Sequence, residues 1–226
     1  MDYVVFLFDI DGTLVRSRRV GWRSIVEAVE QVFGVKDLPP VELGGRTDRG
    51  IFAEVLEALG EGALRRYSEF VDVYHTRLEA NWQLPEFEVL PGVNEILHQI
   101  GQTDGAVAGL LTGNSPTGAK TKLKRAGIWE HFEFGGFGDT DTHRHDVARK
   151  AAIATRNHLP SNARIQLVTI GDTPADISCA RAIDSSAVAV MTGFSSRAQL
   201  EDAKPDLLLE NLCKLNISDF FQKKVS

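Results

Sequence analysis

Three apolar runs in this sequence end in residues that could bind a metal ion or a phosphate group. The first run is followed directly by Asp9, Asp11 and Gly12. Two carboxylates spaced two residues apart share one side of an extended chain and repel each other unless a cation or proton is shared. Gly12 can let the backbone turn sharply or approach a ligand closely. Taken alone, the motif is equally compatible with a solvated acidic turn, because short motifs often match by chance.

The second run, residues 106–111, ends in groups suited to an anion. It is followed by Thr112, Gly113 and Asn114, directly before a segment that can begin a helix. A hydroxyl group and free backbone amides at a helix N-terminus favour anion binding. Considered alone, this motif is explained more simply as a helix cap made by Asn114 or Ser115.

The third run, residues 165–170, leads into two more acidic residues. Asp172 lies at its end, and Asp176 follows within the first turns of a helix that Pro174 can begin. Both side chains could face one site, although each could also serve only to favour the helix dipole. Three such strand ends in one sheet are far harder to attribute to chance than any one of them.

The elements that would position these motifs alternate along the chain. Residues 93–100 place apolar side chains at the spacing of an amphipathic helix, and residues 187–191 and 206–209 predict two shorter strands. Strands that alternate with helices predict a parallel α/β sheet with right-handed crossovers. Ligands of such sheets bind at the carboxyl ends of the strands, where all three motifs would lie.

A helical segment interrupts this alternation after the first strand. Helix-like patterns without a convincing strand cover three stretches, residues 22–33, 49–59 and 63–81. We therefore expect two domains, an α/β catalytic core of residues 1–15 and 90–226 and a helical cap domain of residues 16–89.

The composition excludes several classes of protein. Of the 226 residues, 43% are hydrophobic and 25% are charged, which is typical of a globular chain. The net charge of −6 disfavours nucleic acid as the main partner, and two cysteines do not make a disulfide framework or structural zinc site. The start of the chain lacks a basic segment, and its apolar run is too short to span a bilayer. We expect a cytoplasmic protein without a membrane partner.

Together, the motifs resemble those of the haloacid dehalogenase-like superfamily of phosphohydrolases over nearly the whole chain. The resemblance rests on DxDGT at residues 9–13, TGN at residues 112–114 and GDxxxD at residues 171–176. The helical insertion matches that family's small cap in type and position. The resemblance implies a Rossmann-like parallel sheet core with an inserted α-helical cap domain. It also implies Mg²⁺-dependent hydrolysis of a small phosphomonoester through an aspartyl-phosphate, with a layout like that of phosphoglycolate phosphatases.

Roles for the acidic residues follow from this resemblance. Asp9 would be the nucleophile, and Asp11 would protonate the leaving oxygen and then take a proton from the hydrolytic water. Mg²⁺ would be held by the Asp9 carboxylate, the Asp11 backbone carbonyl and Asp172, with Asp176 close by or orienting a bound water. The chemistry is reasonable, because a carboxylate nucleophile divides one difficult displacement into two easier ones.

Phosphate binding is also implied by the resemblance. Thr112, with the amides of Gly113 and Asn114, would hold phosphoryl oxygens. Gly12 is a further candidate for substrate binding, because its backbone can approach a ligand closely. The expected partner is a small phosphorylated metabolite.

The third motif departs from the family pattern. The family usually supplies a lysine before a helix at this point, whereas residues 138–146 contain none. Arg144 is the best-placed cation, and Lys150, further along, is the second choice. An arginine would keep the charge but replace a point charge with a planar fork. A plain surface arginine is the alternative interpretation.

Two further arginines are candidates for substrate binding. Four arginines cluster between positions 16 and 23, where arginine near a helix N-terminus opposes the dipole. We hypothesise that Arg16, together with Arg46 in a glycine-containing loop, faces the cleft and binds an anionic part of the substrate. A solvated helix start is the simpler explanation of the cluster.

Two other functions compete with a phosphatase. Sugar phosphomutases of the same family keep both aspartates and the same cap type, whereas its dehalogenases lack the second aspartate. Residues 113–121 also come close to a phosphate-binding P-loop, but Ala119 separates the glycine from the lysine. A nucleotide-binding or regulatory module without turnover is therefore the rival from a different class. We read this stretch as a helix start and expect the lysines of that helix, Lys120, Lys122 and Lys124, to be mostly solvated.

Overall fold

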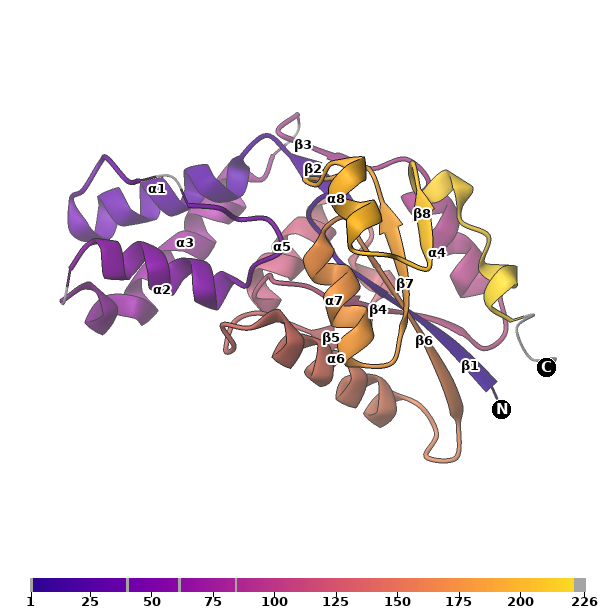
Figure 1. The fold of residues 1–226 in the computed structure, drawn as a ribbon. Coiled ribbons are helices and arrows are strands. Elements are labelled where there is room, and N and C mark those ends of the chain that lie inside the picture. The colour runs from indigo at the N-terminus through magenta and orange to yellow at the C-terminus, as the bar shows by residue number, and fades with distance from the viewer. Residues whose placement is uncertain (1, 40, 61, 84, 222–226) are drawn as a thin grey trace.

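The computed structural model describes residues 2–39, 41–60, 62–83 and 85–221, and a six-stranded parallel sheet is its main element (Figure 1). Its strands are β1 (Asp2–Phe8), β4 (Ala106–Leu111), β5 (Gly135–Gly136), β6 (Arg164–Gly171), β7 (Ser186–Val190) and β8 (Leu207–Leu209). Their order across the sheet is β5-β4-β1-β6-β7-β8, and every neighbouring pair is parallel. The parallel α/β fold expected from the sequence is confirmed.

Strand β1 lies between β4 and β6 and is buried on both faces of the sheet. Val4, Phe6 and Phe8 belong to the hydrophobic cluster that includes residues of α4 (Val93–Gln102), whereas Val5 and Leu7 belong to the cluster that includes residues of α6 (Arg144–His158). The backbone N–H of Asp9 still bonds to β6, at 2.9 Å, so the hydrogen-bonded pairing of the two strands extends one residue beyond β1. Strand alternation therefore directs the Asp9 side chain to the side of the sheet that α6 covers.

Helices cover both faces of the sheet (Figure 1). Helices α5 (Pro116–Arg125), α6, α7 (Pro174–Ala182) and α8 (Arg197–Asp202) each follow a strand of this sheet, whereas α4 directly precedes β4. Short 3₁₀ turns occur at η2 (Trp129–His131), η3 (Leu212–Lys214) and η4 (Ile217–Phe220). Helices α6 and α7 pack against each other, while α4 contacts η3 and η4. The chain segments that follow β1, β4 and β6 consequently meet at the carboxyl edge of the sheet.

The helical segment after β1 lies to one side of the sheet, at the left of Figure 1. It consists of α1 (Val20–Phe33), α2 (Asp48–Ala58), η1 (Ala63–Arg66) and α3 (Tyr67–Asn81). Its interior is aromatic, with the ring centroid of Phe52 lying 5.3 Å from that of Phe70 and 4.7 Å from that of Tyr74. These rings belong to the same hydrophobic cluster as Phe6 and Phe8 of β1, so the helical segment and the sheet share a continuous apolar core.

A two-stranded antiparallel ribbon joins the helical segment to the rest of the chain. It pairs β2 (Val15–Ser17) with β3 (Phe87–Val89). The sequence interpretation without a strand between residues 16 and 89 was wrong at both of its ends. Both strands are short and carry a charged residue at their centre, Arg16 or Glu88, so neither shows the apolar run that marks the equally short β8.

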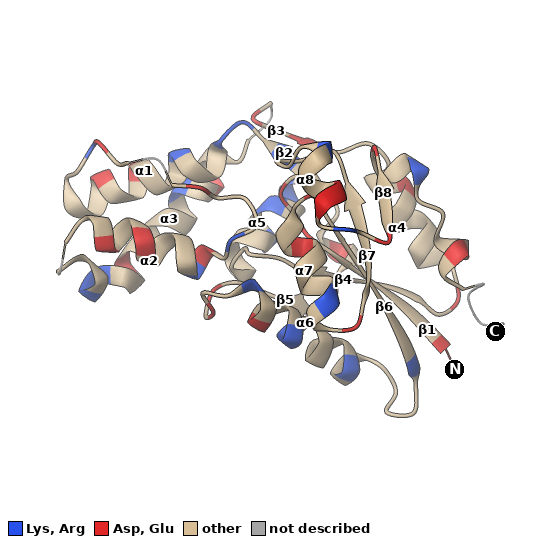
Figure 2. Ribbon diagram, viewed as in Figure 1, with Lys and Arg blue, Asp and Glu red and all other residues tan. Residues whose placement is uncertain are grey.

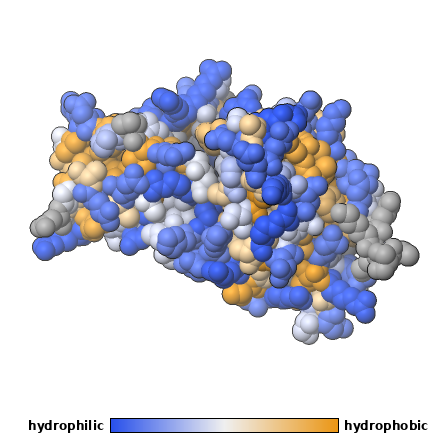
Figure 3. Space-filling model, in the orientation of Figure 1, coloured by the Kyte–Doolittle hydropathy of each residue, from blue (hydrophilic) through white to orange (hydrophobic). Residues whose placement is uncertain are grey.

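The surface is polar and carries charges of both signs. Basic and acidic residues are interspersed over the helices (Figure 2), and hydrophilic residues cover most of the face seen in Figure 3. Within the described ranges, no helix is both long and apolar enough to cross a membrane.

Candidate active site

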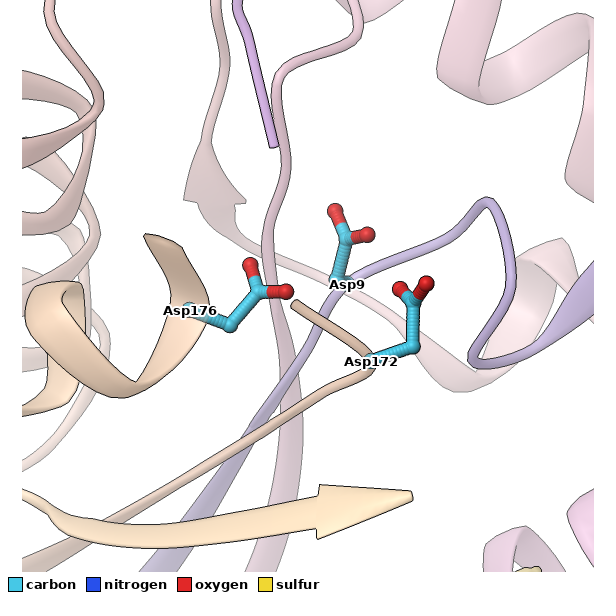
Figure 4. Close-up of side chains that lie close together, drawn as sticks. All are labelled: Asp9, Asp172 and Asp176. Carbon is cyan, nitrogen blue, oxygen red and sulfur yellow. The ribbon is translucent and has the colours of Figure 1, made fainter. Parts of the chain in front are cut away.

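Acidic residues from two adjacent strands and one helix meet at the carboxyl edge of the sheet. Asp9 follows β1, Asp172 follows β6, and Asp176 lies in the first turn of α7. All three are buried, and each offers a carboxylate oxygen within 4.8 Å of the others. Figure 4 shows the three carboxylates gathered around a common point. Because β1 and β6 are parallel neighbours, residues separated by more than 160 positions arrive at the same edge.

Hydrogen bonds orient two of these carboxylates. Asp172 Oδ2 accepts from the backbone N–H of Phe194 at 2.8 Å. Asp176 Oδ2 accepts from the backbone N–H and the hydroxyl of Thr173, at 3.0 and 2.6 Å, and so completes the capping box of α7. Its other oxygen, Oδ1, accepts from Arg144. Both oxygens of Asp176 are thus engaged within the protein.

Burial and mutual repulsion disfavour the ionised forms of the carboxyl groups in this cluster. Desolvation, followed by the charge of Asp176, raises the pKa of Asp9 from 3.8 to about 7. Desolvation and the charges of Asp176 and Asp9 also hold the pKa of Asp172 well above its ordinary value. A buried set of carboxylate oxygens suits a hard divalent cation, which would favour the ionised forms. The donor chemistry of this site therefore fits a Mg²⁺ ion.

Two glycines leave room for the Asp172 carboxylate. A Cβ atom on Gly193 would lie 1.8 Å from Asp172 Oδ2, and one on Gly12 would lie 2.5 Å from the same oxygen. Gly12 also has a φ of +91°, which side-chain-bearing residues rarely adopt. Gly12 thus packs against Asp172, and its expected close approach to a ligand stays a prediction.

Arg144 supplies positive charge to the acidic cluster. It is the first residue of α6, its side chain is only 8% exposed, and it forms ion pairs with Asp9 and Asp176. Its Nη1 and Nη2 atoms lie 3.5 and 3.4 Å from Asp9 Oδ1. Burial opposes this charge, but the two carboxylates outweigh burial and raise the pKa of Arg144. Lys150 lies on the surface instead and pairs with Asp141, so Arg144 is the cation beside Asp9.

Asp11 lies near the cluster but has different partners. Strand β1 ends at Phe8, so strand alternation does not extend to Asp11. Lys122 Nζ lies 2.7 and 2.6 Å from Asp11 Oδ1 and Oδ2, and Asn114 Nδ2 donates to Asp11 Oδ2 at 2.8 Å. The Asp11 side chain is 28% exposed, which leaves its carboxylate within reach of a ligand.

Lys122 is the functional candidate that the sequence interpretation missed. Lys120 and Lys124 are exposed as expected, but the Lys122 side chain is only 6% exposed, so the expectation of a solvated lysine was wrong. Helix α5 begins beside the predicted anion-binding motif, and Lys122 lies seven residues after its capping residue Ser115. Residues seven apart share a helix face. That spacing is the signal by which the sequence could have placed Lys122 beside the site.

The predicted phosphate-binding motif lies between β4 and α5. Asn114 Nδ2 donates to Thr112 Oγ1 at 2.8 Å as well as to Asp11, so one amide group links the two motifs. Ser115 rather than Asn114 caps α5, accepting from the Gly118 backbone N–H at 3.2 Å. The Asn114 side chain is consequently available to the site instead of the helix end.

The helical segment touches this motif directly. A Cβ atom on Gly113 would lie 1.8 Å from the backbone oxygen of Arg46, so only glycine fits there. The backbone N–H of Asp48 donates to Gly113 O at 2.7 Å, and Asp48 Oδ2 accepts from the Ser115 backbone N–H at 2.7 Å. His75 Nε2 lies 2.8 Å from Ser115 Oγ. Residues of the helical segment thus close one side of the site.

The two candidate substrate-binding arginines have partners of their own. Arg16 pairs with Glu88 at 3.1 Å and donates to the backbone oxygen of Thr192 at 2.7 Å. Arg46 pairs with Glu54 at 2.6 Å. The hypothesis that these arginines bind an anionic part of the substrate stays a prediction.

Comparison with known proteins agrees with this arrangement. The family described as haloacid dehalogenase-like hydrolase matches residues 6–190. A Caldanaerobacter subterraneus protein provisionally named pyrophosphatase PpaX is 26% identical over 95% of this chain and 94% of its own length. The phosphoglycolate phosphatase of Synechococcus elongatus is 31% identical over 56% of this chain and 57% of its own.

The fold also matches solved structures. CbbY from Rhodobacter sphaeroides, solved in complex with phosphate, superposes with a TM-score of 0.74 at 20% identity, covering 96% of this chain and 97% of that one. The family match spans most of the sequence and includes the strands that carry Asp9, Thr112 and Asp172. This chain belongs to the haloacid dehalogenase-like hydrolase family.

Proposed function

We propose that this protein is a Mg²⁺-dependent phosphatase that hydrolyses a small phosphomonoester through an aspartyl-phosphate on Asp9. The observation that carries the proposal is the buried convergence of Asp9, Asp172 and Asp176 beside Arg144. The names of the relatives, a phosphoglycolate phosphatase and a provisional pyrophosphatase, support phosphoryl chemistry on small substrates.

The metal would be held by the Asp9 carboxylate, the Asp11 backbone carbonyl and Asp172. Both oxygens of Asp176 already accept hydrogen bonds, which supports an orienting role for that residue. When bound, Mg²⁺ would offset the repulsion between an anionic phosphate and these carboxylates.

Two displacements at phosphorus account for the reaction. In the first, an Asp9 carboxylate oxygen forms a bond to phosphorus, the bond to the leaving oxygen breaks, and Asp11 gives that oxygen a proton. In the second, Asp11 takes a proton from water, whose oxygen bonds to phosphorus and releases Asp9 and inorganic phosphate. The separate partners of Asp9 and Asp11 support this division of work, since one carboxylate pairs with Arg144 and the other with Lys122.

Phosphoryl oxygens would be bound by Thr112 Oγ1, by the backbone amides of Gly113 and Asn114, and by the Arg144 guanidinium. The position of the motif at the start of α5 supports this assignment, because helix N-termini attract anions. Gly12, beside Asp172, would let the backbone approach the bound group.

Residues 16–89 would act as a cap domain over a catalytic core of residues 1–15 and 90–226. The contacts of Asp48 and Arg46 with the phosphate-binding motif support this division, because they bring the helical segment to the reacting centre. A cap in this position would exclude water from the leaving-group side and select the substrate. Arg16 and Arg46 are the proposed ligands for an anionic leaving group.

The test is hydrolysis of p-nitrophenyl phosphate with and without Mg²⁺ by the wild type, Asp9→Asn and the surface control Asp202→Asn. We expect Mg²⁺-dependent turnover by the wild type and the control, and none by Asp9→Asn. Equal activity of Asp9→Asn and wild type would overturn the proposal. Tight binding of ATP without turnover of any ester would instead favour the nucleotide-binding module. If the wild type is active, a screen of phosphorylated metabolites would identify its substrate.

A further inference from the structure

Two carboxylates of the site form ion pairs with two different cationic side chains. Arg144 of α6 pairs with Asp9, whereas Lys122 of α5 pairs with Asp11. The Arg144 side chain is 8% exposed and that of Lys122 is 6% exposed, so neither charge is simply a solvated surface group. A lysine is almost never fully buried unless it is paired, so its place beside Asp11 requires an explanation.

We propose that Lys122 is a positioning residue, which holds the Asp11 carboxyl group in the orientation from which it protonates the leaving oxygen. This inference rests on the proposed function, in which Asp11 transfers the proton. Lys122 does not touch the reacting phosphorus in this proposal and acts only through Asp11.

The contacts of Asp11 leave its carboxylate little freedom to rotate. Lys122 Nζ bonds to both carboxylate oxygens, at 2.7 and 2.6 Å, and Asn114 Nδ2 donates to Oδ2 at 2.8 Å. Both donors belong to the segment that follows β4, whose Thr112 is the proposed phosphate ligand. The position of Asp11 is therefore tied to the position of the bound phosphoryl group.

The ammonium group is held in turn by the helical segment. Lys122 Nζ lies 5.2 Å from the ring centroid of Trp82, which directly follows α3 and is fully buried. The Trp82 ring stacks on Phe87 of β3, with centroids 5.2 Å apart and an angle of 16° between the rings. A cation over an aromatic face is attracted to it, and this attraction strengthens where water is excluded. Lys122 thus lies between the Asp11 carboxylate and the buried ring of Trp82.

Displacement of Asp11 should slow hydrolysis most for an ester whose leaving group must be protonated. A nitrophenolate leaves without one, whereas the more basic phenolate of phenyl phosphate depends on proton transfer in the transition state. Removing Lys122 should therefore slow the hydrolysis of phenyl phosphate much more than that of p-nitrophenyl phosphate. A merely structural role would slow both reactions alike.

The experiment compares kcat and KM for both esters in Mg²⁺ for the wild type, Lys122→Met, Lys122→Gln and Lys122→Arg. Lys124→Met is the matched control, because Lys124 lies on the same helix and is exposed. We expect Lys122→Met to lower kcat/KM on phenyl phosphate by about 100-fold, and on p-nitrophenyl phosphate by less than about threefold. The comparison uses kcat/KM because it reports the steps up to formation of the aspartyl-phosphate, whereas kcat also includes the attack of water, which Asp11 assists equally for both esters. Lys122→Arg keeps the charge and should recover most of the loss.

Thermal unfolding of each variant separates this effect from misfolding. Because Asp11 is partly exposed, water can replace the lost partner, and Lys122→Met and Lys122→Gln should stay folded. Equal losses of kcat/KM on both esters in a folded variant would overturn the role of Lys122 while leaving the proposed function intact. Absence of turnover by the wild type would overturn both.

Discussion

The carboxylate of Asp48 accepts a hydrogen bond of 2.7 Å from the backbone N–H of Ser115, the residue that caps α5. Asp48 begins the second helix of the helical segment, whereas Ser115 follows the proposed phosphate-binding motif of the sheet. The contact therefore joins the two parts of the molecule beside the site. Desolvation raises the pKa of Asp48 from 3.8 to about 6, although Lys122 and the Ser115 amide oppose that rise.

This contact predicts a particular dependence of stability on pH. A carboxyl group whose pKa is raised in the folded state binds more protons there than in the unfolded chain, so its effect on stability becomes less favourable as pH rises from about 4 to about 6. Asp48→Asn keeps an oxygen acceptor for Ser115 and removes this titration. We expect its free energy of unfolding to fall less than that of the wild type between pH 4 and pH 7, by up to about 3 kcal/mol.

Urea denaturation at a series of pH values checks this prediction, with Asp202→Asn as an exposed control. Parallel pH profiles of Asp48→Asn and the wild type would contradict it.

Arg144→Met should impair both stability and catalysis. Arg144 is buried between Asp9 and Asp176. Removing its charge leaves the two buried carboxylates without a counterion, which lowers the free energy of unfolding by about 3–5 kcal/mol, and protonation of a carboxylate would offset part of this loss. Arg144→Lys keeps the charge but loses the planar fork, so we expect a stable enzyme with about 10- to 100-fold lower kcat. Thermal unfolding and p-nitrophenyl phosphate kinetics measure the two effects.

Lys150 provides the matched control for this series, because it lies on the same helix and pairs only at the surface with Asp141. Lys150→Met should behave like the wild type in both measurements. If Lys150→Met were the impaired variant and Arg144→Met were not, the assignment of the third-motif cation would be reversed.

Mg²⁺ should stabilise the folded protein as well as activate it. The ion would relieve repulsion within the buried carboxylate cluster and bind only to the folded chain. At a concentration 100 times its Kd, we expect a gain of about 2.7 kcal/mol in the free energy of unfolding, removed by EDTA. Asp172→Asn should lose most of this gain, and a full Mg²⁺-induced shift in the Tm of that variant would refute the assignment of Asp172.

Gly193→Ala should disturb the site through Asp172. The added Cβ would lie 1.8 Å from Asp172 Oδ2, so the carboxylate must move. We expect kcat to fall by about 100-fold, because small misplacements at a reacting centre are costly. Gly21→Ala is the control, because a Cβ at Gly21 in α1 meets nothing within 4 Å and should leave the kinetics unchanged. Similar kinetics for the two variants would show that Asp172 tolerates displacement.

The alternation of strands and helices, and the motifs at the strand ends, could be predicted from local sequence. Strands such as β1 and β6 can be recognised from their long apolar runs, because a strand that is buried on both faces of a parallel sheet has apolar residues at most of its positions. The short strands β2, β3 and β5 have no comparable apolar run, because Arg16 and Glu88 interrupt the first two and β5 consists of two glycines. Their pairing with distant residues is what makes them strands.

By itself, the sequence determined which chemical groups are present and which of them follow strands, since strand and helix patterns depend on neighbours in the chain. Only the tertiary structure decided which groups meet. Lys122 resembles its exposed neighbours Lys120 and Lys124 in the sequence, yet it alone of the three lies against Asp11 and Trp82. Arg144 and Lys150 differ in the same way, because the helix face that each occupies determines whether its charge reaches a buried carboxylate or water. Burial and ion pairing depend on residues far apart in the chain, and only folding brings those residues together.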